Sequence, residues 1–204
     1  MKILTNSIRP AQTSVDAERS KRLYEEYAYV LDFLPTGRYS GDKLRHIVAP
    51  TVQVVGEDYF TLLEAELRPG LSVEPYERIN VGKDSRQKID RVIGRISYVE
   101  LTASAKAELP VVLEEMIQKQ EPRFVDFLNQ VQPLTPRMHS LELLPGVGKK
   151  SMWQIVDQRE RKPFTSFRDI LRRTPLGDPA SKIARRIVEE LEEQPKYRLF
   201  TRAA

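Results

Sequence analysis

A glycine-rich turn followed by two lysines is the segment whose residue types and spacing best suit ligand binding; it reads Leu-Pro-Gly-Val-Gly-Lys-Lys over residues 144–150. The proline stops a preceding helix, and the two glycines allow a sharp turn whose backbone no β-carbon obstructs. A helix that begins after the second glycine presents free N–H groups and its positive end, beside the two lysine cations. The pattern predicts a site that holds a sugar-phosphate backbone without reading bases. Its predicted residues are Pro145, Gly146, Val147, Gly148, Lys149 and Lys150.

The residues on both sides of this turn predict a helix-hairpin-helix element, the class of module that binds DNA or RNA without sequence preference. Apolar residues precede the turn and recur after it at helical spacing, so two helices can pack on each other. These residues are Leu141, Leu143, Leu144, Met152, Ile155 and Val156. The alternative is an ordinary helical hairpin in which the glycine-rich turn binds no ligand and the lysines are simply exposed to solvent.

A second, degenerate unit follows the first. It comprises Asp169–Arg173, a turn over Thr174–Asp178 and a helix over Pro179–Leu191, with Gly177 as its only glycine and no lysine pair. We expect this unit to pack against the first rather than to bind phosphate equally well. Four arginines could extend a basic surface, or could be ordinary solvated helix charges. They are Arg172, Arg173, Arg185 and Arg186.

Charge is distributed unevenly along the 204 residues. Residues 1–136 contain 18 Lys and Arg against 20 Asp and Glu, whereas residues 137–204 contain 15 against 9. The positive excess therefore lies in the same third of the chain as the hairpin, as a polyanion-binding segment requires.

Composition excludes several other kinds of site. The chain has no cysteine, which removes disulfides, thiolate metal sites and a cysteine nucleophile. Its two histidines, His46 and His139, are far apart in sequence, so we expect neither a metal nor another cofactor. No apolar run is long enough to cross a bilayer, and the N-terminus lacks the apolar core of a signal peptide, so we expect a cytoplasmic protein without a membrane partner.

Hydrophobic periodicity predicts an α+β protein in which a small antiparallel β-barrel precedes an all-helical domain. Strands are expected over 27–34, 51–55, 59–67, 72–81 and 92–101, separated by turn residues at the spacing of a small barrel. Helices are expected from Thr102 through Ile117, from Pro122 through Val131, and over 137–144, 149–160, 166–173 and 179–193. This divides the chain into an arm (1–22), a barrel (23–101), a helical connector (102–136) and a paired helix-hairpin-helix domain (137–204).

The chain as a whole also resembles an uncharacterised archaeal family known as domain of unknown function 655. The resemblance covers residues 24–193 and is carried by four segments: Tyr29–Pro35, Glu77–Gly82, Ile89–Ile96 and His139–Gly146. It implies an OB-like or S1-like barrel, then a helix-hairpin-helix domain, and RNA as the partner.

Barrels of that kind bind single strands through aromatic and basic side chains on one face. The candidates here are Tyr59, Phe60, Tyr76, Arg78, Arg91, Arg95 and Tyr98. The alternative is that Phe60 belongs to the core and that arginines such as Arg78 and Arg95 form ion pairs.

We therefore expect a non-catalytic nucleic-acid-binding protein, with RNA favoured over DNA and the oligomeric state left open. One alternative is a DNA-binding accessory factor of repair or recombination, and another is a protein–protein adaptor. A third is a DNA glycosylase, since Lys150 and Asp169 have a suitable spacing; however, Asp169 fits a helix cap after Ser166, and no large helical domain supplies a base-flipping pocket. No residues are assigned to catalysis, and the pairs Glu114-Glu115 and Glu189-Glu190 are interpreted as solvated helix faces.

Overall fold

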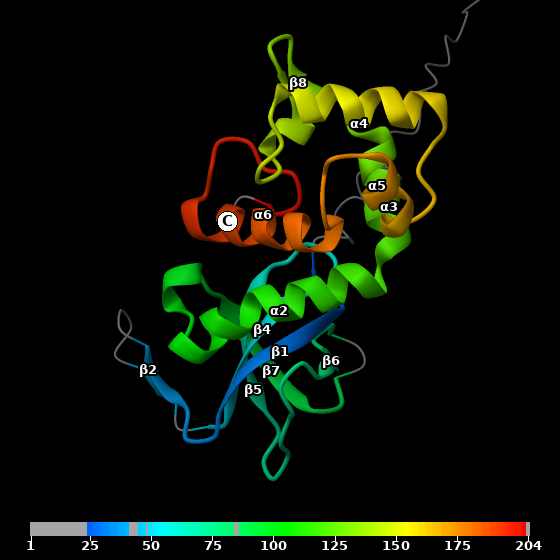
Figure 1. Cartoon of the computed structure of the whole chain (residues 1–204). Helices are drawn as coiled ribbons and strands as arrows, with labels where there is room; N and C mark the ends of the chain where they lie inside the picture. The colour runs from blue at the N-terminus through cyan, green and yellow to red at the C-terminus, as the bar shows by residue number, and fades with distance from the viewer. Residues whose placement is uncertain (1–23, 41–44, 48, 84–85, 203–204) are drawn as a thin grey trace, which may run out of the picture.

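The computed structural model describes residues 24–40, 45–47, 49–83 and 86–202, so the predicted arm over 1–22 lies outside the described residues. A curled antiparallel sheet occupies one end of the molecule and the helices gather at the other, with one long helix between them (Figure 1). The α+β class predicted from the sequence is therefore confirmed.

Five strands form the main sheet in the order β6-β1-β4-β5-β7, and each neighbouring pair is antiparallel. Their bounds are β1 Tyr27–Leu34, β4 Thr51–Gly56, β5 Leu62–Leu67, β6 Arg78–Asn80 and β7 Ile89–Arg95. The sheet curls into a half-barrel, since β6 and β7 each pair on one side only. A separate pair, β2 Arg38–Ser40 and β3 Arg45–Ile47, was not predicted.

Three predicted strands were too long. The 59–67 segment forms a strand only from Leu62 onward, as β5. Only the last residues of the 72–81 segment form a strand, because Pro75 has no N–H to donate and Tyr76 adopts a left-handed backbone with φ of 64°. The 92–101 segment leaves the sheet after Arg95 and forms a 3-10 turn, η1, over Tyr98–Glu100.

The two faces of the sheet bury different cores. One face encloses a cluster within the half-barrel that includes Val30, Val54, Leu63 and Ile79. The other face contributes Tyr29, Leu31, Val55, Phe60 and Leu62 to a cluster that continues without a break into the helices.

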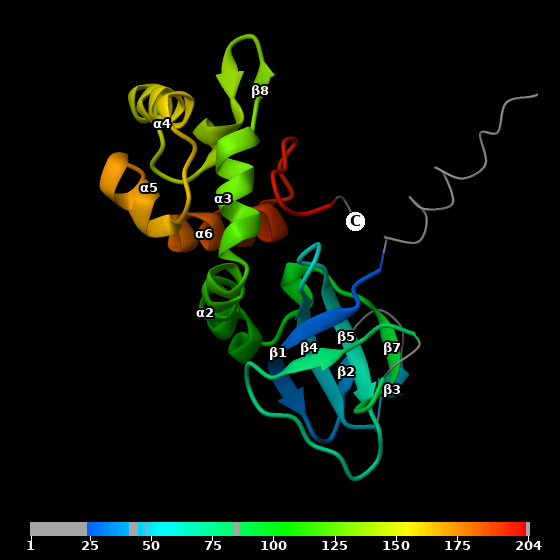
Figure 2. The same ribbon diagram turned by 90° about the vertical axis from the view of Figure 1, so that its right-hand side faces the viewer.

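Helix α2, Ala103–Lys119, connects the sheet to the other helices and is fixed at its first residue (Figure 2). The Thr102 hydroxyl accepts the Ala105 N–H at 3.0 Å, as the predicted N-cap requires, and donates to Asp32 Oδ2 of β1 at 2.6 Å. The Thr102 N–H donates to Gln53 Oε1 of β4 at 2.9 Å. A local cap and two sheet residues thus set the direction of α2.

The remaining helices agree closely with the sequence, with one exception. They are α3 Glu121–Gln130, α4 Lys149–Arg161, α5 Phe167–Arg173 and α6 Pro179–Glu193. The helix predicted over 137–144 was wrong: a short hairpin, β8 Pro133–Thr135 and β9 Met138–His139, precedes a 3-10 turn, η2, over Ser140–Leu143. Pro133 and Pro136 favour the extended hairpin, and His139 ends it because its Nδ1 accepts the Leu141 N–H.

Two further features concern the described ranges alone. No helix within them is both long and apolar enough to cross a bilayer. No group of three or more His, Asp or Glu side chains in them could hold a metal ion.

A buried carboxylate holds the C-terminal segment against the helices. Glu190 of α6 is fully buried, so its interpretation as a solvated residue was wrong. Its two oxygens accept the N–H groups of Leu199, Phe200 and Thr201 and the Thr201 hydroxyl, at 2.6 to 3.1 Å. Arg186 Nε completes the set at 2.9 Å. This arrangement places Phe200 against Phe124 and Phe127 of α3.

Replacing Glu190 with Ala should lower the free energy of unfolding by about 3 to 5 kcal/mol, because buried Arg186 would lose its 2.9 Å carboxylate partner and several N–H groups would lose their acceptor. Urea denaturation measures the change. Glu189→Ala removes the neighbouring carboxylate, which is partly exposed, and should cost less than about 1 kcal/mol. Similar losses in both variants would contradict this role for Glu190.

Candidate nucleic-acid interface

The predicted phosphate-binding turn adopts an open and well-defined conformation. Leu144 and Val147 are buried and anchor it, and Val147 N–H donates to the Leu144 carbonyl at 3.0 Å. Gly146 has a φ of 77°, a left-handed conformation that favours glycine. The buried side chains of Leu144 and Val147 thus hold the turn against the core, whereas Gly146 and Gly148 are exposed.

No side chain of the described residues caps the backbone donors in the first turn of α4. Gly148 is the N-cap, and it has no side chain with which to accept the first N–H groups. A β-carbon at Gly148 would meet nothing within 4 Å, so the space beside the helix end is open to a ligand. Because α4 is 13 residues long, its N-terminus also presents the positive end of a full helix dipole.

Three lysines lie beside this helix end, and none of them forms an ion pair with a carboxylate of the described residues. Lys149 and Lys150 are exposed, and neither forms an ion pair within the part of the chain that the structure describes. Lys182, from α6, reaches the same turn: a methyl group on Gly146 would lie 2.9 Å from its Nζ. The structure therefore adds a third cation to the two that the sequence indicated.

The second turn, over residues 174–178, differs from the first because a side chain caps the helix that follows it. Gly177 also has a φ of 77°, but the N-cap of α6 is Asp178, whose Oδ1 accepts the Ala180 N–H at 3.0 Å. This carboxylate covers a backbone donor and places a negative charge where a phosphate would have to lie. The geometry gives a physical reason for the prediction that the second unit differs from the first.

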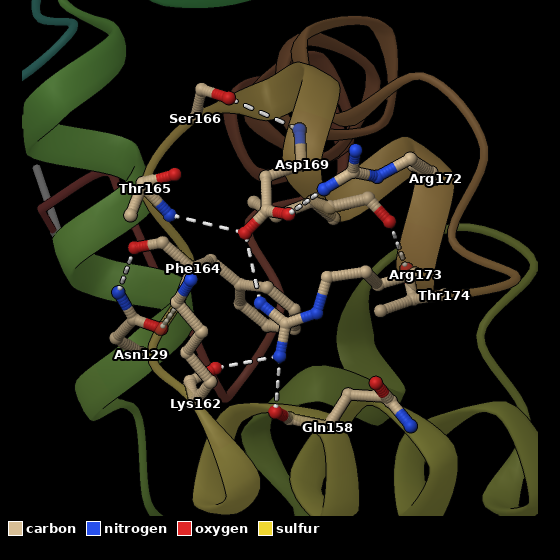
Figure 3. A network of polar contacts seen from close by, with 11 residues as sticks. Asn129, Gln158, Lys162, Phe164, Thr165, Ser166, Asp169, Arg172, Arg173 and Thr174 are labelled. Carbon is tan, nitrogen blue, oxygen red and sulfur yellow. Dashed lines mark hydrogen bonds and ion pairs between the residues drawn. The ribbon is translucent and has the colours of Figure 1, made fainter.

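Two of the four candidate arginines are used inside the fold. Arg173 donates to Asp169 at 2.8 Å and to the carbonyls of Gln158 and Lys162, and it lies over the Phe164 ring (Figure 3). Arg186 is buried and, besides Glu190, binds the Tyr197 carbonyl. These guanidinium groups join segments of the helical part to one another.

The other two arginines lie on the surface in ordinary helix pairs. Arg172 is 3.2 Å from Asp169, and Arg185 is 3.3 Å from Glu189, with most of each arginine side chain exposed. Exposed pairs of this kind are weak and exchange readily, so both guanidinium groups remain accessible to a polyanion.

Asp169 has the helix-capping position that the sequence predicted. The Ser166 hydroxyl accepts the Asp169 N–H at 3.0 Å, and the Asp169 carboxylate accepts the Thr165 N–H as well as both neighbouring arginines (Figure 3). The hydrogen bond from Arg173 is the main reason why the pKa of Asp169 lies below its ordinary value. The Asp169 carboxylate thus already accepts hydrogen bonds from one backbone N–H and from two arginines.

The structure distributes the barrel candidates over different parts of the sheet. Arg78 is the first residue of β6 and Tyr76 lies just before it, Arg91 and Arg95 belong to β7, and Tyr59 lies in the turn between β4 and β5. Most of them have partners in the fold. The Tyr76 hydroxyl donates to Glu108, Arg78 pairs with Glu57 at 2.6 Å, Arg91 pairs with Glu66 at 2.6 Å, and Arg202 lies over the Tyr59 ring. Phe60 is fully buried, as the alternative interpretation expected.

Sequence reasoning missed two residues near the first turn, Lys182 and Trp153. Nothing in the sequence indicates Lys182, because its place beside Gly146 depends on how α6 packs. The sequence does contain an indication for Trp153, because it lies off the apolar stripe of Met152, Ile155 and Val156. In the structure its side chain is largely exposed.

Comparisons with known proteins agree on one relationship. A family model described as protein of unknown function (DUF655) matches residues 24–202. The chain is similar to the uncharacterized protein MJ0038 of Methanocaldococcus jannaschii, with 44% identity over 182 residues that cover 88% of this chain and 81% of the relative. It is also similar to the crystal structure of Af1531 from Archaeoglobus fulgidus, described with the same family model, at 45% identity and a TM-score of 0.79 over 87% of this chain and 100% of that one.

Gly146→Ala should lower the free energy of unfolding by about 1 to 2 kcal/mol, the cost of a left-handed backbone in a residue that has a β-carbon. The new methyl group would also displace Lys182 from the turn. Thermal or urea unfolding measures the loss. Gly94→Ala is the matched control, since its β-carbon has open space and no left-handed φ, and it should change stability by less than about 0.5 kcal/mol. Equal effects would show that Gly146 is not conformationally required.

Proposed function

The chain belongs to the DUF655 family, and we propose that it is a non-catalytic nucleic-acid-binding protein that holds a sugar-phosphate backbone at the open N-terminus of α4. The proposal rests on two observations combined. The N–H groups in the first turn of α4, after Gly148, have no side-chain cap, and the three lysines beside them lack carboxylate partners among the described residues. A phosphodiester oxygen satisfies both the donors and the charge.

Two turns of equal length support a paired helix-hairpin-helix arrangement. Five residues separate the end of η2 from the start of α4, and five separate α5 from α6. Each turn contains one glycine with a φ of 77°. We propose that the first turn binds phosphate and that the second, capped by Asp178, supports it and carries Lys182 to the site.

The strand order supports an OB-like barrel. The sheet places β6 beside β1 and β7 beside β5, as in a partly open five-stranded Greek-key barrel that lacks only the contact between β6 and β7. The two edges approach each other, because Val81 and Val92 line the same cavity. We propose RNA as the target on the strength of the family resemblance, since contacts to phosphates do not by themselves distinguish RNA from DNA.

The double variant Lys149→Ala with Lys150→Ala should weaken binding to oligonucleotides of any sequence and reduce the slope of log Kd against log salt by about 2, because two phosphate contacts are lost. Fluorescence anisotropy over a range of salt concentrations measures both quantities. The control, Lys162→Ala with Lys196→Ala, removes the same charge elsewhere and should change the slope much less. An unchanged double variant would exclude the turn as the binding site.

The same titrations decide between the candidate partners. Binding of RNA that is tighter than binding of duplex DNA with equal charge is expected. The reverse order would favour a DNA-binding accessory factor, and no binding of either at low salt would favour a protein–protein adaptor.

Gly148→Ser should separate binding from stability. Serine is a preferred N-cap residue, and its hydroxyl would accept an N–H group of the first turn of α4, so the free energy of unfolding should stay the same or rise by about 0.3 kcal/mol. Affinity for nucleic acid should nevertheless fall roughly fivefold, because that N–H would no longer be available to a phosphate.

Asp178→Ser is the matched control for this variant, since it keeps a side-chain cap on α6 and should not weaken binding. Gly148→Ser binding with wild-type affinity would mean that the backbone donors of α4 do not contact the ligand.

A further inference from the structure

We propose that the groove between the β8–β9 hairpin and α4 takes an unpaired base of a single-stranded nucleic acid and stacks it on Trp153. The inference rests on the proposed function and deepens it, because it names the form of nucleic acid and a second contact beside the phosphate site. We call this cavity the Trp153 groove; its walls include Pro136, Arg137 and His139 on one side and Lys149, Met152 and Trp153 on the other.

The position of Trp153 is unusual for a folded protein. It is the only tryptophan of the chain, and 65% of its surface is exposed, although tryptophans are on average well buried. Met152 beside it is buried in the core and fixes this part of α4. A rigid helix thus presents a large aromatic side chain to the solvent, as a stacking platform for bases requires.

The groove has the size of a ligand site and lies next to the phosphate site. Its volume is about 370 Å³, within the range of roughly 300 to 1,000 Å³ that is usual for small-ligand pockets. Lys149 belongs both to the open turn and to the groove. Trp153 follows one helical turn later, about 6 Å along the axis of α4, a distance that one nucleotide can span.

The charge of the groove also fits a nucleotide. Neither Lys149 nor Arg137 has an ion-pair partner within the described ranges. The carboxylate that lines the groove, Glu142, accepts the His139 backbone N–H at 2.8 Å and so serves as a local cap. Asp157, one turn beyond Trp153, pairs with Arg161 at 3.0 Å. The uncompensated charge is therefore positive, as an anionic strand needs.

His139 can add a hydrogen bond to a base. Its Nδ1 accepts the Leu141 N–H at 3.1 Å, so the proton of the neutral imidazole is on Nε2, where it can be donated to a carbonyl or ring nitrogen. Burial, and then the charge of Arg159, lower the pKa of His139, which favours the neutral ring.

A single strand fits this arrangement better than a duplex. The stacking faces of paired bases are covered by their neighbours in a duplex, and only an unpaired base can offer its face to an indole. Phosphates alone would satisfy the lysines but would leave Trp153 without a role.

Trp153 emission provides a direct test, because no other tryptophan contributes to it. The full chain is titrated with a 12-nucleotide oligoadenylate RNA, with an abasic oligomer of equal charge, and with a 12-base-pair RNA duplex. The single strand should quench the emission by more than half, whereas the abasic oligomer and the duplex should bind through the open turn and quench it little.

Substitutions give the second readout. Trp153→Leu should weaken oligoadenylate binding by about 10-fold or more in fluorescence anisotropy, without changing affinity for the abasic oligomer. Trp153→Phe should retain most of the affinity, because a stacking ring remains.

The outcomes separate this inference from the proposed function. If Lys149→Ala with Lys150→Ala weakens binding of all three probes but Trp153→Leu changes none, the Trp153 groove is excluded and the phosphate site stands. If no probe binds at low salt, both fail. A concentration-dependent change in Trp153 emission without nucleic acid would indicate that a second copy of the chain covers the groove, and would also overturn the inference.

Discussion

The packing of α2 between the sheet and the other helices is the constraint on which the rest of the structure depends. Its apolar residues, among them Leu109, Leu113 and Met116, are buried in one cluster that includes Tyr29 and Leu31 of the sheet and extends to the helices beyond. Because that cluster is continuous, neither half can change its orientation without exposing apolar surface of the other. The hydrogen bonds from Thr102 to β1 and β4 fix where α2 begins, and so where every later helix lies.

This shared core explains how the proposed site is kept rigid. The open turn rests on Leu144 and Val147, which belong to the same cluster as the sheet face. Lys182 reaches the turn from α6, and α6 packs on α2. A phosphate at the first residues of α4 would therefore contact groups from two helices whose relative position is already set, which limits the entropy lost on binding.

Lysine and arginine have different roles in the helical part. Arg159, Arg173 and Arg186 each donate to backbone carbonyls of distant segments, since a planar guanidinium carries several donors in a fixed geometry. Lys149 and Lys182 form no such contacts in the part of the chain that the structure describes. The basic residues of the segment therefore divide into arginines such as Arg173 and Arg186 that hold the fold together, and lysines and arginines such as Lys149 and Arg172 whose side chains are exposed.

The sequence alone determined those features that depend on neighbouring residues. Helices α2, α4, α5 and α6 could be predicted within one or two residues, because their caps and apolar spacing are local, and the glycines of the first turn already indicated its backbone. Only the tertiary structure decided that Glu190 is buried, that Arg173 and Arg186 point inward, and that Lys182 and Trp153 lie beside the turn. The physical reason is distance along the chain: a cap joins residues three apart, whereas burial and side-chain pairing are set by segments that meet only when the whole core has formed.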